Sequence, residues 1–147
     1  MRVVALKTLD LDPHARLYTT VFNGHPWNEN WSVANASQRL NCYRSTPNFI
    51  GIEAQEGEAL LGFIIGNFEP YQSGQVYVLK EMCVATQVQR KGVGAQMLGK
   101  LHAILQDRKI ETVNLVTRKN SDAESFYMKH GYAQAQRVGL YIRDLRD

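Results

Sequence analysis

Cysteine, proline and long apolar runs are scarce in this chain of 147 residues, which has 2 Cys and 4 Pro. Cys42 and Cys83 lie far apart without the C-x-x-C spacing of a zinc or redox site, so a disulfide framework is excluded and two reduced thiols are expected. The longest nearly apolar stretch, residues 59–68, has about half the length that crosses a bilayer. The apolar residues after Arg2 are too few for a secretory signal. We therefore expect no metal site, no membrane contact and a cytoplasmic protein.

Charge of one sign is also scarce, since Lys+Arg 17 and Asp+Glu 14 leave a formal net charge of +3. This excess is too small and too dispersed to indicate a nucleic-acid surface. The composition, 44% hydrophobic and 21% charged, is near the globular average and excludes disordered, coiled-coil and collagen-like proteins. At about 100 to 200 residues per domain, the length predicts one domain over residues 1–147.

The hydrophobic period alternates between strand and helix along the chain. A meander of antiparallel strands is expected between residues 48 and 84, and later strands alternate with helices, which predicts an α+β fold with a mixed sheet. Asp12 is expected to be the N-cap of the first helix and Ser32 that of the second. The strands are expected at residues 2–7, 49–54, 59–68, 75–84, 112–117 and 138–145, and the helices at 13–23, 32–46, 92–107 and 121–130.

The segment with the most chemical information is a strand that leads into a glycine-containing helix start. Two cations, Arg90 and Lys91, are followed by Gly92 and Gly94 in the first turn. Free backbone N–H groups and the helix dipole favour an anion there, and glycine lets a diphosphate approach the backbone. The third glycine of the dinucleotide fingerprint and the Gly-Lys-Ser/Thr of a P-loop are missing. The alternative is that the two glycines only make a turn.

The segment Gln89-Arg90-Lys91-Gly92-Val93-Gly94 resembles the Gln/Arg-x-x-Gly-x-Gly/Ala signature of the GNAT superfamily, N-acetyltransferases that use acetyl-CoA. Residues 120–132 look like the second signature of that family: Asn, then Ala, then Phe-Tyr, then Gly and an aromatic residue. The expected order of elements is also similar. The resemblance implies a mostly antiparallel sheet of about six to seven strands with about four helices, and a cleft for acetyl-CoA where two strands splay apart.

The resemblance also implies a set of coenzyme-binding residues. Pantetheine would pair with the exposed backbone of residues 82–84, backbone N–H groups from 89 to 95 would hold the pyrophosphate, and Asn120 and Phe126 would line the far side. The implied cofactor-binding residues are Met82, Cys83, Val84, Gln89, Arg90, Lys91, Gly92, Val93, Gly94, Ala95, Asn120, Phe126 and Tyr127.

Two catalytic residues are expected for direct attack of an amine on the thioester in a ternary complex. Tyr127 stands where the family commonly places the acid for the departing thiolate, and an ordinary pKa of about 10 suits a proton donor; the alternative is helix core. The N–H of Val84 would polarise the carbonyl. Glu81 would act as base or amine anchor, because burial on an apolar strand raises its pKa. Family members often place this base where the chain has Val78 or Lys80, so a structural ion pair of Glu81 with Lys80 or an arginine stays open.

Strand alternation places Glu81 on the face of Tyr77, Leu79 and Cys83, provided that no bulge intervenes. Val76, Val78, Met82 and Val84 would share the opposite face. The surroundings of Glu81 therefore depend on the regularity of this strand.

The acceptor side in the family is the loop between the two early helices. Trp27, Glu29 and Trp31 suit a cationic amine through cation-π contacts and charge pairing, although the tryptophans also suit packing of the loop onto the sheet. Tyr18, Tyr43 and Tyr71 are further candidates for the lining of this site. We expect a small cationic amine as acceptor; a protein or peptide amine and a non-catalytic coenzyme sensor are alternatives. A homodimer through the C-terminal strand is a further implication of the resemblance.

Overall fold

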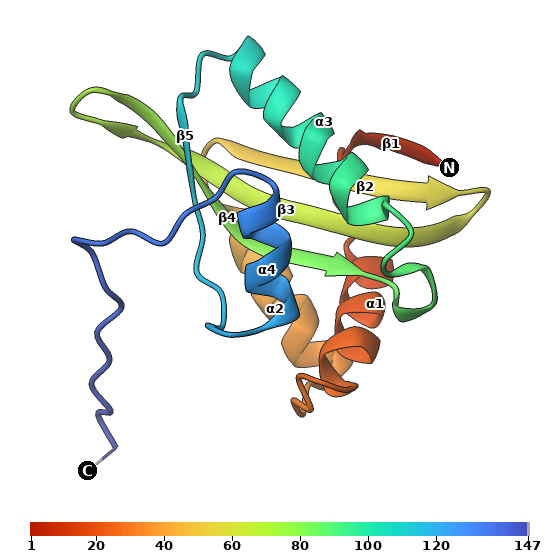
Figure 1. The fold of residues 1–147 in the computed structure, drawn as a ribbon. Coiled ribbons are helices and arrows are strands. Elements are labelled where there is room, and N and C mark those ends of the chain that lie inside the picture. The colour runs from red at the N-terminus through yellow and green to blue at the C-terminus, as the bar shows by residue number, and fades with distance from the viewer. Residues whose placement is uncertain (147) are drawn as a thin grey trace. The chain divides into compact units, whose positions relative to one another are not determined.

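The computed structural model describes residues 1–146, and its first unit, Met1–Val116, contains a sheet in the order β1-β2-β3-β4-β5 (Figure 1). The first four strands pair antiparallel and β5 runs parallel to β4. The predicted α+β class with a mixed sheet is confirmed, with five strands among the described residues instead of six or seven. The strands are β1 (Arg2–Ala5), β2 (Phe49–Glu56), β3 (Ala59–Tyr71), β4 (Gly74–Val84) and β5 (Thr112–Asn114).

Helices cover both faces of this sheet. Within the first unit, α1 (Asp12–Asn23) and α2 (Val33–Arg44) lie on one face and α3 (Val93–Asp107) on the other, after the short 3-10 helix η1 (Thr86–Val88) (Figure 1). None of the helices described in residues 1–146 combines the length and apolarity of a membrane span.

Side-chain acceptors fix the starts of α1 and α2. Ser32 caps α2 as expected, with its hydroxyl oxygen 3.0 Å from the N–H of Asn35. The expected cap of α1 is wrong by one residue: Leu11 is at the N-cap and Asp12 is already helical. The reason is that the Asp10 carboxylate accepts from the N–H of Asp12 at 3.0 Å, while Asp12 pairs with Arg16.

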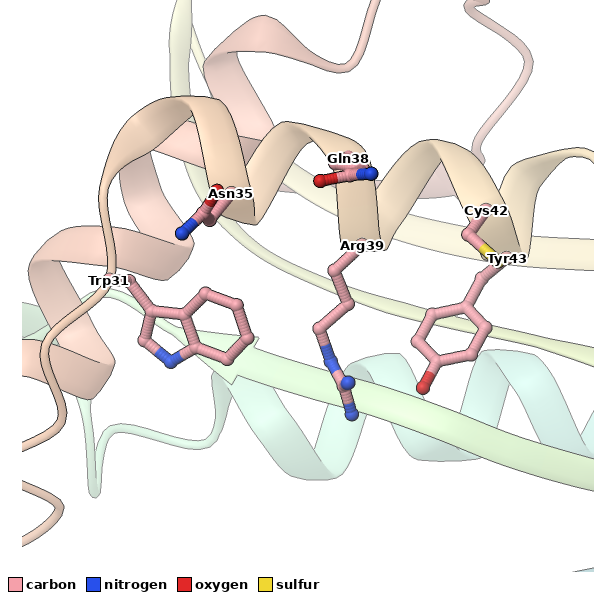
Figure 2. A pocket seen from close by; sticks show the side chains of 6 residues that line it. All are labelled: Trp31, Asn35, Gln38, Arg39, Cys42 and Tyr43. Atoms are coloured by element: carbon pink, nitrogen blue, oxygen red, sulfur yellow. The ribbon is translucent and has the colours of Figure 1, made fainter. Parts of the chain in front are cut away.

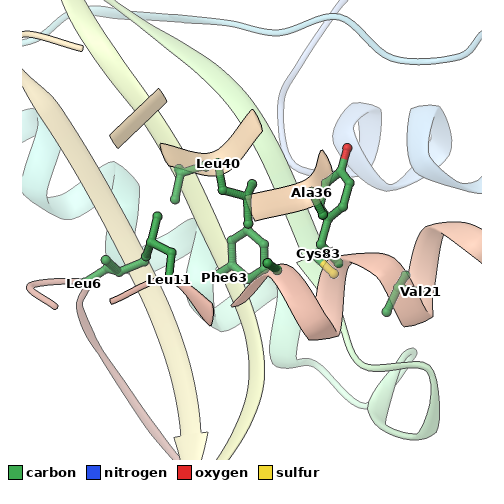
Figure 3. Packing of buried hydrophobic residues seen from close by; sticks show 10 residues of the cluster. Leu6, Leu11, Val21, Ala36, Leu40, Phe63 and Cys83 are labelled. Carbon is green, nitrogen blue, oxygen red and sulfur yellow. The ribbon is translucent and has the colours of Figure 1, made fainter. Parts of the chain in front are cut away.

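A buried apolar cluster holds α1 and α2 against the sheet (Figure 3). Residues spaced three or four apart on each helix meet residues of β3 and β4, and burial of this kind contributes about 25 cal/mol per Å². Side chains of α1, α2 and β4 are thereby brought to one place. The cluster consists of Leu6, Leu11, Ala15, Tyr18, Val21, Ala36, Leu40, Phe63, Ile65 and Cys83.

A β-bulge interrupts the pairing of β3 with β4. Ile65 lies opposite Glu81 and Gly66 opposite Leu79, which leaves Lys80 as the extra residue. Because directly opposed residues share a face, Glu81 lies on the face of Ile65, toward α1 and α2. The expected face assignment, which assumed a regular strand, is therefore wrong.

The bulge exchanges the faces of the side chains that follow it. Glu81 and Cys83 lie with Val76 and Val78, whereas Met82 and Val84 lie with Tyr77 and Leu79 on the face of α3; these groups follow from the register of β3 with β4. In a regular strand, the carboxylate of Glu81 would instead point toward α3.

The second unit, Thr117–Asp147, contains α4 (Asp122–Lys129). Ser121 caps this helix with its hydroxyl oxygen 3.1 Å from the N–H of Glu124, whose carboxylate accepts from the N–H of Asn120. The strand predicted at residues 138–145 is wrong: no residue from 133 to 146 is in a strand, and Val138 and Ile142 are exposed. Alternating hydrophobicity supplies an apolar face, but a strand also needs a neighbour for its backbone hydrogen bonds.

Gly66 has no room for a side chain opposite the bulge. A Cβ there would collide with the carbonyl oxygen of Val78 and lie 2.7 Å from Cζ of the Tyr77 ring. We expect Gly66→Ala to lower the free energy of unfolding by at least about 2 kcal/mol. Gly99→Ala is the control, because a Cβ on this exposed helical position meets nothing within 4 Å and should stabilise by about 0.5–1 kcal/mol. Urea unfolding measures both; equal stability of Gly66→Ala and the parent would contradict the close approach.

Candidate functional site

Glu81 is the centre of a polar cluster between β4, α1 and α2. Its Oε1 accepts from Nε of Arg39 at 2.6 Å and from the hydroxyl of Tyr18 at 3.1 Å. Burial raises the pKa of Glu81, and the hydrogen bond and positive charge of Arg39 oppose that rise. Burial, together with the charge of Glu81, raises the pKa of Tyr18. Of the alternatives left open for Glu81, an ion pair with an arginine is present, while Oε2 accepts no hydrogen bond from the described residues.

The guanidinium of Arg39 lies between two aromatic rings. Its Cζ is 5.7 Å from the centroid of the Trp31 ring and 5.2 Å from that of Tyr43. The ammonium of Lys80 is 5.8 Å from the Tyr43 ring. These are cation-π distances. The Trp31 and Tyr43 rings and the hydrogen bond to Glu81 hold the planar guanidinium in place.

An open pocket of about 500 Å³ lies along α2 beside this cluster. The pocket is shallow and faces solvent over most of its extent. In Figure 2 the guanidinium of Arg39 points away from α2, with the rings of Trp31 and Tyr43 on either side of it. The lining residues are Trp31, Asn35, Gln38, Arg39, Cys42 and Tyr43.

The three expected acceptor residues separate in the structure. Trp31 lines the pocket, and its ring centroid lies 5.2 Å from that of Tyr18 in α1. Trp27 is not part of the lining and lies 5.5 Å from the Phe22 ring. Glu29 accepts from the indole N–H of Trp31 at 2.9 Å and is also not part of the lining.

Of the three tyrosines considered for the lining, only one is in it. Tyr43 lines the pocket. Tyr18 is not part of the lining and donates to Glu81, while Tyr71 is exposed at the turn between β3 and β4 and is also not part of the lining.

The outer edge of β4 is paired over only part of its length. β5 pairs with residues 76–78, so the edge of residues 79–84 has no strand beside it among the described residues. Met82, Cys83 and Val84 lie in this stretch. The side chain of Cys83 belongs to the core, where burial raises its thiol pKa, so this residue offers only its backbone to a ligand.

The helix start after β4 has a left-handed backbone at two positions. Gly92 has φ 87 and Arg90 has φ 62, and no side chain caps α3. A Cβ on Gly92 would meet nothing within 4 Å, so the space in front of this residue is open. Conformational freedom and open space are both what an approaching pyrophosphate requires of this glycine.

The N–H groups of this loop are not all available. That of Gln89 donates to the carbonyl of Thr86 at 3.3 Å, and the Gln89 side chain donates to the carbonyl of Val84 at 2.9 Å. The first bond into the helix runs from the N–H of Gln96 to the carbonyl of Gly92 at 3.0 Å. The N–H groups of residues 93–95 precede it and belong to the first turn, which has no carbonyl partners of its own. Gln89 thus stabilises the loop, and the backbone N–H groups of residues 93–95 are the donors that remain for a ligand.

The residues of the second signature gather around α4. Tyr127 is 9% exposed, and its ring centroid is 5.4 Å from Phe126 and 5.5 Å from Tyr132. Burial raises the pKa of Tyr132 to about 12. Asn120, with φ 57, precedes the cap of the helix.

Arg39 is the functional candidate that the sequence reasoning missed. It shares a helical stripe with Asn35 and Tyr43, four residues away on either side. This spacing is the signal, but it identifies the residue only once the position of Glu81 is known. A second missed pair, His14 and Glu53, is buried in the same layer with Nε2 2.8 Å from Oε2.

Solved structures with the same fold include several acetyltransferases. A probable acetyltransferase has 20% identity and a TM-score of 0.80, over 100% of this chain and 99% of that chain. An aminoglycoside acetyltransferase from an uncultured soil metagenomic sample, in complex with trehalose, has 20% identity and a TM-score of 0.74 over 97% and 95%. A ribosomal-protein-alanine N-acetyltransferase from Brucella melitensis biovar Abortus 2308 has 14% identity and a TM-score of 0.74 over 97% and 98%.

Comparison of the sequence with curated proteins finds no match. Residues 13–132 match the family model described as the acetyltransferase (GNAT) family. This match covers most of the chain and includes both signature segments, and the fold of the solved acetyltransferases agrees with it. The chain therefore belongs to the GNAT family of acetyltransferases.

Proposed function

We propose that this acetyltransferase transfers the acetyl group of acetyl-CoA to the primary amine of a small molecule, by direct attack in a ternary complex. The observation that carries the proposal is the position of Glu81. This buried carboxylate lies in the unpaired stretch of β4, directly before residues 82–84, and accepts a hydrogen bond from Arg39, which lines the open pocket along α2. Family membership supplies the reaction class.

The loop at the start of α3 fits the diphosphate of the coenzyme. The N–H groups of residues 93–95 would bind it, and the open space and left-handed backbone at Gly92 would admit it. Arg90 and Lys91 would add positive charge, and residues 82–84 would pair with pantetheine through their backbone. Asn120 and Phe126 would line the far side.

The chemical step divides between three groups of this chain. Acetyl-CoA supplies an activated thioester carbonyl. Oε2 of Glu81 would take a proton from the ammonium form of the acceptor, and the neutral nitrogen would then form the C–N bond while the N–H of Val84 donates to the carbonyl oxygen. The nitrogen would lose its second proton to solvent as the amide forms. Tyr127 would give its proton to the sulfur as the C–S bond breaks. A phenol is a suitable donor for this step, because tyrosine side chains ordinarily titrate well above neutral pH.

We also propose that both units belong to one domain and that the enzyme works in the cytoplasm. The family model extends across residues 117–132 of the second unit and so supports one domain. The two free cysteines, with the exposed Cys42, support a reducing compartment.

The first test is release of free thiol from acetyl-CoA with a panel of primary amines and a lysine-containing peptide. We expect release that depends on a small amine, and mass spectrometry of the product should show an added acetyl group. Tight coenzyme binding without release for any amine would support a sensor instead. Release with the peptide alone would support a protein substrate.

Tyr127→Phe belongs to the same measurement. With an accepted amine, kcat should fall about 100-fold and coenzyme affinity should change little, because only the proton donor is removed. An unchanged kcat would contradict the acid role.

Gly92 allows a matched pair of substitutions at the diphosphate site. Asn and Asp have the same shape, and both tolerate the left-handed backbone better than other side chains. We expect Gly92→Asp to weaken coenzyme A binding at least about tenfold more than Gly92→Asn does, because only Asp adds a negative charge beside the diphosphate. Calorimetry with coenzyme A measures both. Equal affinities of the two variants would place the diphosphate elsewhere.

Variants of two buried glutamates on the same sheet face can distinguish a catalytic role from a structural one. Glu81→Gln should lower kcat/KM about 100-fold or more at neutral pH. Glu53→Gln is the control, since Glu53 is equally buried and hydrogen-bonds His14 of α1, but it does not touch the pocket residues. Thermal unfolding should show a loss of stability for both variants, and only Glu81→Gln should lose activity. Equal activity of the two would identify the Arg39 ion pair as purely structural.

A further inference from the structure

The guanidinium of Arg39 is only partly used by the protein. Its Nε donates to Glu81, and the described residues offer no hydrogen-bond partner to Nη1 and Nη2. The side chain is 41% exposed and lines the pocket. The two terminal nitrogens form a fork whose geometry matches both oxygens of a carboxylate.

The charges around the pocket differ from those expected of a site for a polycationic amine. Arg39 is charged, and the other residues that line the pocket are neutral. Glu29 accepts from the Trp31 indole and Oε1 of Glu81 accepts from Arg39, which leaves only Oε2 of Glu81 for a single ammonium group. Lys80 adds a second positive charge beside Tyr43. A second ammonium group on the acceptor would meet these cations.

The same residues suit a molecule with an amine at one end and an anion at the other. Oε2 of Glu81 accepts no hydrogen bond from the described residues, so it keeps the capacity to accept one from an ammonium or amine beside Arg39. Arg39, which hydrogen-bonds the same carboxylate through its Nε, presents its fork toward the pocket between the rings of Trp31 and Tyr43 (Figure 2).

We propose that the acceptor is an amino acid or a similar amine that carries a carboxylate, and that Arg39 selects it by binding this carboxylate through Nη1 and Nη2. This inference rests on the proposed acetyltransferase function and names its substrate class. Arg39 is thus the specificity-determining residue of the acceptor pocket.

The test compares each acid with its own carboxamide. The probes are the proteinogenic amino acids, β-alanine and 4-aminobutanoate, each with the corresponding amide, and 1,3-diaminopropane as a dication. For at least one pair, we expect kcat/KM of the acid to exceed that of the amide at least about tenfold, as loss of a charge-assisted hydrogen bond predicts. An α-carboxamide makes the neighbouring amine less basic and so more reactive at neutral pH, which works against the expected preference.

Two arginines of α2 provide matched variants. Arg39→Met should bring the acid-to-amide ratio close to one, even though the absolute rates of both substrates fall when Glu81 loses its partner. Arg39→Lys keeps the charge without the fork and should give an intermediate ratio. Arg44→Met is the control, because Arg44 stacks on Phe49, at 4.6 Å, and does not line the pocket. Its ratio should equal that of the parent.

The outcomes distinguish this inference from the proposed function. Equal or better use of amides or of the diamine, or an unchanged ratio in Arg39→Met, overturns the role of Arg39 while acetyl transfer stands. If no amine is acetylated, the proposed function fails. Calorimetry with the coenzyme A-saturated protein then compares the affinity for each acid with that for its amide. Tighter binding of acids than of amides by the parent but not by Arg39→Met supports the inference, and equal binding overturns it.

Discussion

The bulge at Lys80 is the constraint on which the rest of the site depends. One extra residue in β4 turns the Glu81 carboxylate from the face of α3 to the face of α1 and α2. Gly66 makes the bulge sterically feasible, because a side chain there would collide with the Val78 carbonyl and the Tyr77 ring. The acidic group, its two hydrogen-bond donors and the aromatic pocket therefore meet because of backbone geometry, not because of an acidic motif.

The apolar cluster around Phe63 and Leu40 gives this geometry its stiffness. α1 and α2 each contribute one polar residue to Glu81, and each helix is held by apolar neighbours one turn away. Desolvation that raises the pKa of Glu81 and the ion pair that restrains it thus have one structural origin. Desolvation makes such a carboxylate more basic, and its hydrogen bonds and ion pair offset the cost of burying it.

Much of the fold could be predicted from the sequence, because periodicity and capping act locally. Ser32 marked the start of α2, and the glycine segment marked the start of α3. The strand predicted at residues 138–145 was wrong because a strand needs a neighbouring strand to pair with, and alternating hydrophobicity does not supply one. The bulge could not be predicted from the sequence, because a strand with one extra residue has the same local pattern as a regular strand. Arg39 was missed because its importance arises only when Glu81 lies beneath it.

In the proposed mechanism, Arg39 would connect recognition of the acceptor with the acid–base chemistry of Glu81. Its hydrogen bond and positive charge both hold the pKa of Glu81 below the value that burial alone would produce. An acceptor carboxylate bound to the terminal nitrogens would offset part of that charge, and the pKa of Glu81 would rise. A carboxylate with a higher pKa is a stronger base, provided that it stays ionised at the working pH. Binding of the correct acceptor would therefore strengthen the base that removes its proton, and an amine without the acidic group would meet a weaker base.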